Sequence, residues 1–335
     1  MDILNALVAF LNFVFIPAAA YGGQLALGAL GVTLIYAILR FSNFAHGDTM
    51  AFGTAVTILA TWGLQSLGVT LGVLPTALLA LPVGIAATAV LVLATDRAVY
   101  RFYRRQRAAP IIFVMASVGV MFVMNGVTRL LIGVDEQRFD DGARFIIAVR
   151  DFREWSGLAE GLALRSTQAL TVVVTALVCA ALFWFLNRTR SGKAMRAYSD
   201  NEDLALLSGI DPERVVRLTW IIAAGLMTIA GVLYGLDKAF RPFNYFQILL
   251  PIFAAAIVGG LGNPVGAIAG GFLVAFSEVA VTYPWVKVAG YLFPGWQPDG
   301  LLQLLGTEYK FAVSFIILIG VLLFRPTGLF RGKSV

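Results

Sequence analysis

The polar groups able to do chemistry within the apolar part of this chain gather in one stretch, Phe41-Ser42-Asn43-Phe44-Ala45-His46-Gly47-Asp48. Histidine and aspartate are common general acids and bases, and His46 is the only histidine of the chain. A multi-histidine metal site is therefore excluded, and an enzyme built on His46 and Asp48 would lack a second catalytic group. The chain also contains neither His-Glu-x-x-His nor Gly-x-Ser-x-Gly, so we expect no catalytic residues.

This stretch has two interpretations, and the sequence leaves both open. Asparagine, histidine and aspartate are too costly to face lipid, so they must face protein, water or a solute. In the first interpretation, Asn43 and His46 cap a helix break at the membrane edge and satisfy backbone groups that the break exposes. In the second, the stretch borders a path for a solute, and the residues predicted to line that path are Asn43, Phe44, His46, Gly47 and Asp48.

A second unusual stretch, residues 259–271, is rich in glycine. Gly262, Gly266 and Gly270 fall four residues apart, which predicts a helix face where backbones pack closely. The step Asn263-Pro264 should break or reverse that helix. Both stretches contain an asparagine followed within a few residues by glycine, and paired interrupted helices point to a site at the midplane of a transporter. We therefore add Gly262 and Asn263 to the predicted path.

The elements that must position these stretches are membrane-spanning helices. Of the 335 residues, 59% are hydrophobic and 13% charged, which lies far outside the range of soluble proteins. We predict an all-α polytopic bundle, a single membrane domain over residues 1–335, with about ten transmembrane or re-entrant helices. Spans joined closely around residues 41 and 263 predict interrupted helices near the midplane. The candidate spans are 4–20, 22–39, 42–64, 71–95, 109–132, 167–187, 215–236, 246–262, 264–283 and 309–324.

A polar island, residues 188–217, separates two of these spans and contains two helix starts. Ser199 and Glu202 have the spacing of a capping box, so a short helix should follow them. Gly209 is the residue type that ends a helix in the left-handed conformation. Asp211 followed by Pro212 predicts the start of the next helix.

The short helix in the island would have an apolar side formed by Leu204, Leu207 and, to a lesser degree, Leu206. An exposed apolar face on a rigid loop is what a docking element for another protein requires. The alternative is that this face packs against the chain's own helices.

The distribution of lysine and arginine predicts the orientation of the chain. Loops on one side of the predicted membrane hold fifteen of these residues, and loops on the other side hold nine. The positive-inside rule then places the polar island in the cytoplasm, with both termini on that side. This topology explains the net charge of +6, so we expect no nucleic-acid partner. The first apolar run lacks the preceding lysine or arginine of a signal peptide, so we expect a retained span.

The outer side is predicted to consist of loops 134–165 and 284–308. In the first loop seven acidic residues are interspersed with arginines, which indicates either an ordinary solvated surface or salt-sensitive docking of a soluble delivery protein. The second contains Trp285, Tyr291 and Trp296, and these residue types favour the membrane interface.

Four segments resemble one family of transport proteins. Arg196-Ala197 and the run Asp203 to Ile210 resemble the EAA loop of ABC importer permeases, with aspartate where many members have glutamate. Residues 31–53 resemble the signature of the LivH-type permeases of branched-chain (hydrophobic) amino acid importers, and residues 257–262 and 306–328 resemble later segments of the same family. The segment 284–306 is longer than we expect of that family.

The resemblance implies that the island holds a coupling helix, which sits in a cleft of an ATPase subunit and transmits its motion. It implies a multi-pass protein of the bacterial inner membrane with four kinds of partner: two ABC ATPase subunits, a second permease subunit of the LivM type, a periplasmic substrate-binding protein and membrane lipid. ATP and magnesium would bind the ATPase subunits, so we expect no cofactor or metal on this chain. The coupling residues implied are Arg196, Ala197, Asp203, Leu204, Ala205, Leu206, Leu207, Gly209 and Ile210.

The expected function is that of a permease subunit in an importer for branched-chain or other small amino acids. A permease of the same superfamily for urea and other amides, sugars or nucleosides is one alternative. An ion-driven secondary transporter is another, although such proteins more often carry buried acids at mid-span.

Overall fold

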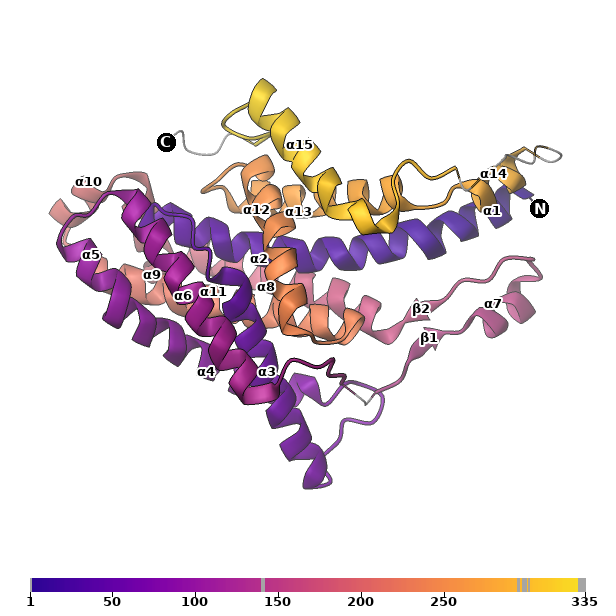
Figure 1. The fold of residues 1–335 in the computed structure, drawn as a ribbon, viewed down its shortest axis with the longest axis horizontal. Helices are drawn as coiled ribbons and strands as arrows, with labels where there is room; N and C mark the ends of the chain where they lie inside the picture. The colour runs from indigo at the N-terminus through magenta and orange to yellow at the C-terminus, as the bar shows by residue number, and fades with distance from the viewer. Residues whose placement is uncertain (1, 140–141, 294–295, 297–299, 301, 331–335) are drawn as a thin grey trace.

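A computed structural model describes residues 2–139, 142–293, 296, 300 and 302–330, and they form an all-α bundle with one short hairpin of strands (Figure 1). This confirms the predicted all-α polytopic membrane bundle. Eight of the described helical stretches are long and apolar enough to cross a membrane. The α-helices are α1 (Asp2–Phe10), α2 (Ile16–Leu39), α3 (His46–Ser66), α4 (Ala77–Thr95), α5 (Arg101–Arg105), α6 (Pro110–Ile132), α7 (Val149–Ser156), α8 (Ser166–Arg188), α9 (Arg190–Asp200), α10 (Glu202–Leu207), α11 (Pro212–Lys238), α12 (Pro242–Gly259), α13 (Pro264–Thr282), α14 (Val286–Leu292) and α15 (Lys310–Phe324). The other elements are π-helical turns at Leu11–Phe15 and Asp96–Tyr100, a 3₁₀ turn at Thr307–Tyr309, and the antiparallel strands β1 (Phe145–Ile147) and β2 (Leu164–Arg165).

The amino-terminal helix is longer than predicted. α1, the π-helical turn and α2 run without a break from Asp2 to Leu39, so the predicted spans 4–20 and 22–39 form one helix of 38 residues. The pair Gly22-Gly23 does not interrupt it. Both glycines are buried, and a Cβ there would collide with Phe272 and Thr175. Close helix packing therefore accounts for these glycines.

The continuous helix corrects the predicted placement of the termini. Figure 1 shows the start of α1 beside α14, whereas the described carboxyl end, Phe330, returns to the turn between α12 and α13, toward the opposite end of the bundle. Asn5 accepts a hydrogen bond from the backbone N–H of Glu160, in the loop predicted to be outer. The prediction that both termini lie on one side is therefore wrong. The prediction counted two membrane crossings in residues 4–39, where the chain makes one.

The centre of the bundle is α2, which packs against α8, α11, α12 and α13. Its residues from Leu25 to Ile35 are all buried, as expected of a helix that is apolar on every side. α3 is also long, but its mean hydropathy is lowered by buried threonines. Thr49, Thr54, Thr57 and Thr61 each donate a hydrogen bond to the carbonyl four residues earlier, so these hydroxyls are satisfied inside the helix.

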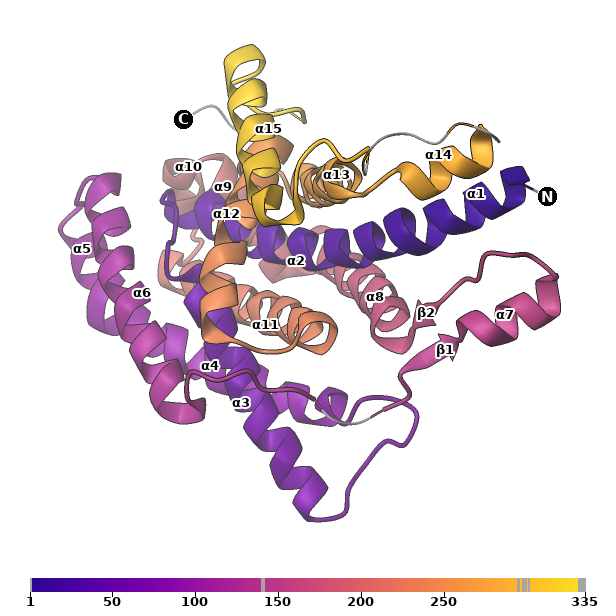
Figure 2. The same ribbon diagram turned by 45° about the vertical axis from the view of Figure 1, so that its right-hand side comes forward.

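Three segments far apart in the sequence form a lobe at the amino-terminal end of the bundle (Figure 2). Ala6 and Ala9 of α1 pack against Val288 of α14. Glu160, from the loop 134–165, accepts hydrogen bonds from Lys287 Nζ at 2.9 Å and Tyr291 Oη at 2.7 Å. This outer lobe therefore joins the start of the chain to both predicted outer loops, although residues 294–295, 297–299 and 301 of the second loop lie outside the described residues.

Candidate functional site

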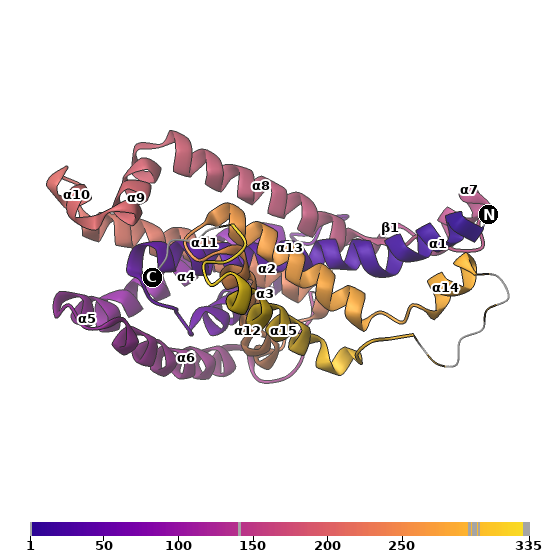
Figure 3. The same ribbon diagram turned by 90° about the horizontal axis from the view of Figure 1, so that it is seen from above.

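The polar island forms two short helices at the end of the bundle opposite the outer lobe (Figure 3). The predicted capping box is wrong, because α9 continues through Ser199 to Asp200. The cap of α10 is Asn201, whose side chain accepts a hydrogen bond from the backbone N–H of Leu204 at 3.0 Å. Glu202 instead accepts a hydrogen bond from Tyr198 Oη at 2.6 Å. Serine and asparagine are comparable N-cap residues, so residue type alone did not decide between Ser199 and Asn201.

The end of α10 follows the prediction. Gly209 has a φ of +78°. The backbone N–H of Ile210 donates to the carbonyl of Ala205, and that of Gly209 donates to the carbonyl of Leu206, the two bonds of a Schellman motif. Asp211 then caps α11 by accepting from the backbone N–H of Glu213 at 2.9 Å. α10 is thus fixed at both ends.

The apolar face of α10 is not covered by the described part of this chain. Leu204 is 60% exposed, Leu206 43% and Leu207 85%, whereas Ala205 is buried. The alternative that this face packs on the chain's own helices is therefore wrong for all three leucines. The other residues predicted to couple to an ATPase are distributed in the same way: Arg196, Ala197, Asp203 and Gly209 are exposed, and Ile210 is half-buried.

The island is attached to the membrane helices through α9. Met195 and Tyr198 belong to the continuous buried core of the bundle. Arg40, directly after α2, donates a hydrogen bond from Nη2 to the carbonyl oxygen of Ser199 at 2.7 Å. The end of α2 is therefore fastened to the helix that carries α10.

The break between α2 and α3 contains the polar stretch 41–48. Asn43 is buried, and its Oδ1 accepts hydrogen bonds from the backbone N–H of Ala45 at 3.1 Å and from Tyr100 Oη at 3.3 Å. Asn43 therefore satisfies a backbone group of the break, as the first interpretation predicts, but α3 begins without a side-chain cap and His46 makes no capping hydrogen bond. His46 is fully buried against Gly31, where a Cβ would meet the imidazole ring at 2.8 Å. The cavity that Asn43 lines measures only about 10 Å³, so in this conformation the stretch is packed rather than open.

The remaining residues of this stretch contact α6 and α12. The backbone N–H of Phe44 donates to Ser117 Oγ at 3.1 Å, and the Phe44 ring lies 5.2 Å from the Phe253 ring. Asn125 Nδ2 donates to Asp48 Oδ1 at 2.6 Å. A Cβ on Gly47 would collide with the backbone of Tyr245, so this glycine is required for helix packing. The pathway role of these residues stays a prediction.

Sequence reasoning missed a second polar network next to the break. Asp96 is 5% exposed and accepts hydrogen bonds from Trp220 Nε1 at 2.9 Å and, through both oxygens, from Arg104. Tyr100, the donor to Asn43, stacks on the Trp220 ring at 5.5 Å. The break is thereby joined to the first turns of α11. The signal in the sequence was a single acid, Asp96, at the end of an apolar run.

The glycine-rich stretch turns at the end of the bundle and not at its midplane. Gly262 has a φ of +82° in the turn between α12 and α13, so it does not share a helix face with Gly266 and Gly270, contrary to the prediction. Asn263 caps α13 by accepting from the backbone N–H groups of Val265 and Gly266, and its Nδ2 donates to the carbonyl of Phe330.

The position of this turn is shown by its neighbours. Gly262 and Pro264 line a cavity of about 170 Å³ together with Arg196, Ser199 and Asp200 of α9. Gly266 and Gly270 do pack closely, because a Cβ on either would collide with the backbone of α12. The turn therefore lies beside the coupling segment.

Comparisons with known proteins all point to one family of transport proteins. The family described as branched-chain amino acid transport system, permease component, matches residues 15–322. The chain is 30% identical over 321 residues to the high-affinity branched-chain amino acid transport system permease protein BraD of Pseudomonas aeruginosa, with 94% of each chain covered. It is 30% identical over 323 residues to LivH of Escherichia coli K12, a protein of the same description, with 94% of this chain and 93% of LivH covered.

An archaeal relative extends the similarity. The probable branched-chain amino acid transport permease protein LivH of Methanocaldococcus jannaschii is 30% identical over 315 residues, with 93% of this chain and 90% of the relative covered. No solved structure matches the chain. The chain belongs to the family of permease components of branched-chain amino acid transport systems.

Proposed function

We propose that this chain is the transmembrane permease subunit of an ATP-driven ABC importer for branched-chain or other small amino acids. The names of the relatives support the class of solute. The observation that carries the coupling role is the unpartnered apolar face of α10, on which Leu207 is 85% exposed at the tip of a capped helix. A leucine so exposed outside the membrane spans suits a cleft of another protein.

The end of the bundle that carries α10 faces the cytoplasm. Arg40, Arg101, Arg104 and the arginines of the polar island lie at that end, in agreement with the positive-inside rule. The amino terminus is then outside, and Asp2 is the only charged residue in its first turns. Separate ATPase subunits bind ATP and magnesium, a related permease chain completes the pore, and a soluble substrate-binding protein docks on the outer lobe.

The mechanism is differential stabilisation of two conformations. An ATPase that binds α10 more tightly in one of its states shifts the permease toward the matching state by the difference in binding free energy. α9 carries this displacement to Arg40 and so to the packed stretch 41–48. Opening of that stretch toward a second permease subunit would expose Asn43, His46 and Asp48 to the solute.

The test is uptake into proteoliposomes that contain the chain together with the subunits that copurify from its native membrane. We expect leucine uptake only when ATP is on the side of α10 and the binding protein is on the other side. Uptake by the purified chain alone, driven by an ion gradient, would instead establish a secondary transporter. Urea, a hexose and a nucleoside, each tested as a competitor of leucine uptake, distinguish the other solute classes.

A further inference from the structure

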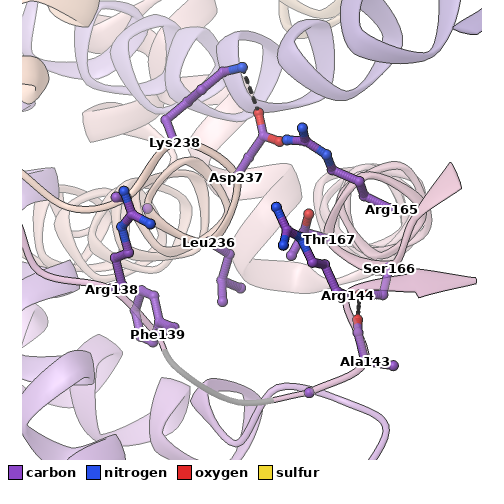
Figure 4. A pocket seen from close by; sticks show the side chains of 13 residues that line it. Arg138, Phe139, Ala143, Arg144, Arg165, Ser166, Thr167, Leu236, Asp237 and Lys238 are labelled. Atoms are coloured by element: carbon purple, nitrogen blue, oxygen red, sulfur yellow. Dashed lines mark hydrogen bonds and ion pairs between the residues drawn. The ribbon is translucent and has the colours of Figure 1, made fainter. Parts of the chain in front are cut away.

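A basic pocket lies at the outer end of the bundle, between the start of α8 and the end of α11 (Figure 4). Its volume is about 700 Å³, which is ample for a solute the size of an amino acid. The charged residues that line it are Arg138, Arg144, Arg165, Asp237 and Lys238. We call it the outer basic pocket. Asp140 and Asp141, next in sequence to its wall, lie outside the described residues.

Two of its arginines have no carboxylate partner among the described residues. Arg138 is engaged by Glu136 at 2.7 Å, and Lys238 lies 3.3 Å from Asp237. Within residues 2–139, 142–293 and 302–330, no carboxylate lies within 4.0 Å of the guanidinium of Arg144 or Arg165. Both side chains extend into the pocket toward Asp237 (Figure 4). Two guanidinium groups suit a carboxylate, because each presents a planar fork of donors.

The pocket also contains a group of the opposite charge. The Asp237 side chain is only 4% exposed, and its Oδ1 is buried with no hydrogen-bond donor among the described residues. A buried carboxylate oxygen without a donor is costly, so a cationic donor reaching it would be favourable. Ser166 and Thr167, the first residues of α8, line the same pocket and add the partial positive charge of a helix start on the anion side.

We propose that the outer basic pocket binds the zwitterion of a small amino acid, with the carboxylate between Arg144 and Arg165 and the ammonium group on Asp237. This proposal rests on the proposed function, because it takes the bound solute to be the one transported. It adds a holding site on the outer side of the packed stretch 41–48. The paired charges favour amino acids over urea, sugars and nucleosides, which lack both groups.

The experiment is a binding titration of the complex as it copurifies, in lipid nanodiscs without ATP and without the soluble binding protein. The probes are L-leucine, 4-methylpentanoate, which lacks the ammonium group, and 3-methylbutylamine, which lacks the carboxylate. We expect leucine to bind most tightly, 4-methylpentanoate more weakly and the amine not measurably. Equal binding of leucine and the amine, or no binding of leucine, would overturn the proposal.

Variants of the arginines and of Asp237 test which side chain binds the carboxylate and which binds the ammonium group. The double variant Arg144→Gln, Arg165→Gln should weaken leucine binding by about tenfold or more. Asp237→Asn should weaken leucine binding without weakening 4-methylpentanoate binding, a difference that a merely structural role would not produce. Arg150→Gln is the matched control, because Arg150 lies in the same loop, is exposed and pairs with Glu154 outside the pocket. The proposal fails if the double variant behaves like this control.

Folding and the proposed function are checked separately. The variant Arg144→Lys, Arg165→Lys keeps both charges and loses the planar forks, so it should bind leucine with intermediate affinity and unfold at the wild-type temperature. ATP-dependent leucine uptake is measured on the same preparation. Suppose that wild type shows normal uptake and that wild type and the double glutamine variant bind leucine equally. The proposed binding site would then be excluded, and the proposed function would remain supported.

Discussion

Arg40 and Ser199 are 159 positions apart in the sequence, and the guanidinium of one lies 2.7 Å from the carbonyl oxygen of the other. The backbone of Arg40, which ends α2, also adopts the left-handed conformation, with a φ of +58°. A non-glycine residue in this conformation costs about 1–2 kcal/mol. The junction between α2 and α9 is therefore both hydrogen-bonded and strained.

Substitution of Arg40 separates these two effects. Arg40→Ala removes the hydrogen bond and keeps the strain, whereas Arg40→Gly removes both. We expect both variants to lower leucine uptake per ATP hydrolysed, and the glycine variant to be the more stable by about 1 kcal/mol. Uptake and ATP hydrolysis are measured in the same proteoliposomes. An unchanged ratio of the two would show that the junction does not transmit motion.

A charge on the apolar face of α10 should uncouple transport. Leu207→Asp places a carboxylate where we expect an apolar cleft of the ATPase, so we expect the ATPase to copurify poorly and uptake to fall at least tenfold. Because Leu207 is 85% exposed, the permease itself should stay folded. Leu67→Asp is the control, since Leu67 is 79% exposed at the opposite end of the bundle. Normal uptake by Leu207→Asp would exclude the docking role.

Any substitution of Gly209, which ends α10, should destabilise that end of the helix. At Gly209 a Cβ would meet no atom within 4 Å, so Gly209→Ala introduces backbone strain without a collision, at a cost of about 1–2 kcal/mol. We expect faster amide exchange in α10, with a smaller effect for Gly209→Asn. Gly119→Ala, at an equally open position within α6, should not destabilise the protein. Protection of α10 equal to wild type in Gly209→Ala would contradict the assigned cap.

The pair Asp48 and Asn125 should show energetic coupling. Asn125→Leu leaves the buried Asp48 without the donor at 2.6 Å, which should lower the free energy of unfolding by about 1–3 kcal/mol. Asp48→Asn combined with Asn125→Asp exchanges the two groups and should recover part of this loss. A double-mutant cycle measured by thermal unfolding gives the interaction energy, and additive effects would show that the contact is weak.

The outer lobe should loosen in acid. Burial would raise the pKa of Glu160, but hydrogen bonds from Lys287 and Tyr291, with a further contribution from Arg153, outweigh it and lower that pKa below its usual value. A carboxyl with a lowered pKa stabilises the folded lobe above its unfolded pKa of about 4.3, and the stabilisation is lost as the pH falls through the folded value.

Amide exchange in α14 at several pH values measures this effect. In wild type, protection should fall below about pH 4, and Glu160→Gln should be less protected near neutral pH, with a flatter acid dependence. Glu154→Gln is the control, because the exposed pair of Glu154 with Arg150 contributes little. An acid dependence in Glu160→Gln equal to that of wild type would remove Glu160 as its cause.

Local signals in the sequence predicted the coupling segment well and the long-range arrangement less well. The Gly209 and Asp211 caps depend on neighbours in the chain, so residue types sufficed. The start of α10 was misplaced because Asn201 and Ser199 are both capping types, and the stable choice depends on Tyr198 holding Glu202.

Periodicity could not predict the continuous amino-terminal helix. The pair Gly22-Gly23 is compatible both with a bend in a helix and with close packing against Phe272, and the sequence does not distinguish the two. The outer basic pocket joins side chains from residue 138 to residue 238, and no short pattern brings such distant residues together.

The helix from Asp2 to Leu39 has a mechanical consequence. At 1.5 Å per residue its 38 residues span about 57 Å, nearly twice the thickness of the hydrocarbon core. A rod of that length transmits a push without any change in its own hydrogen bonds, and a tilt of about 10° displaces one tip by about 10 Å relative to the other. A protein that binds the outer tip at Asn5 and tilts the helix therefore also displaces the junction at Arg40.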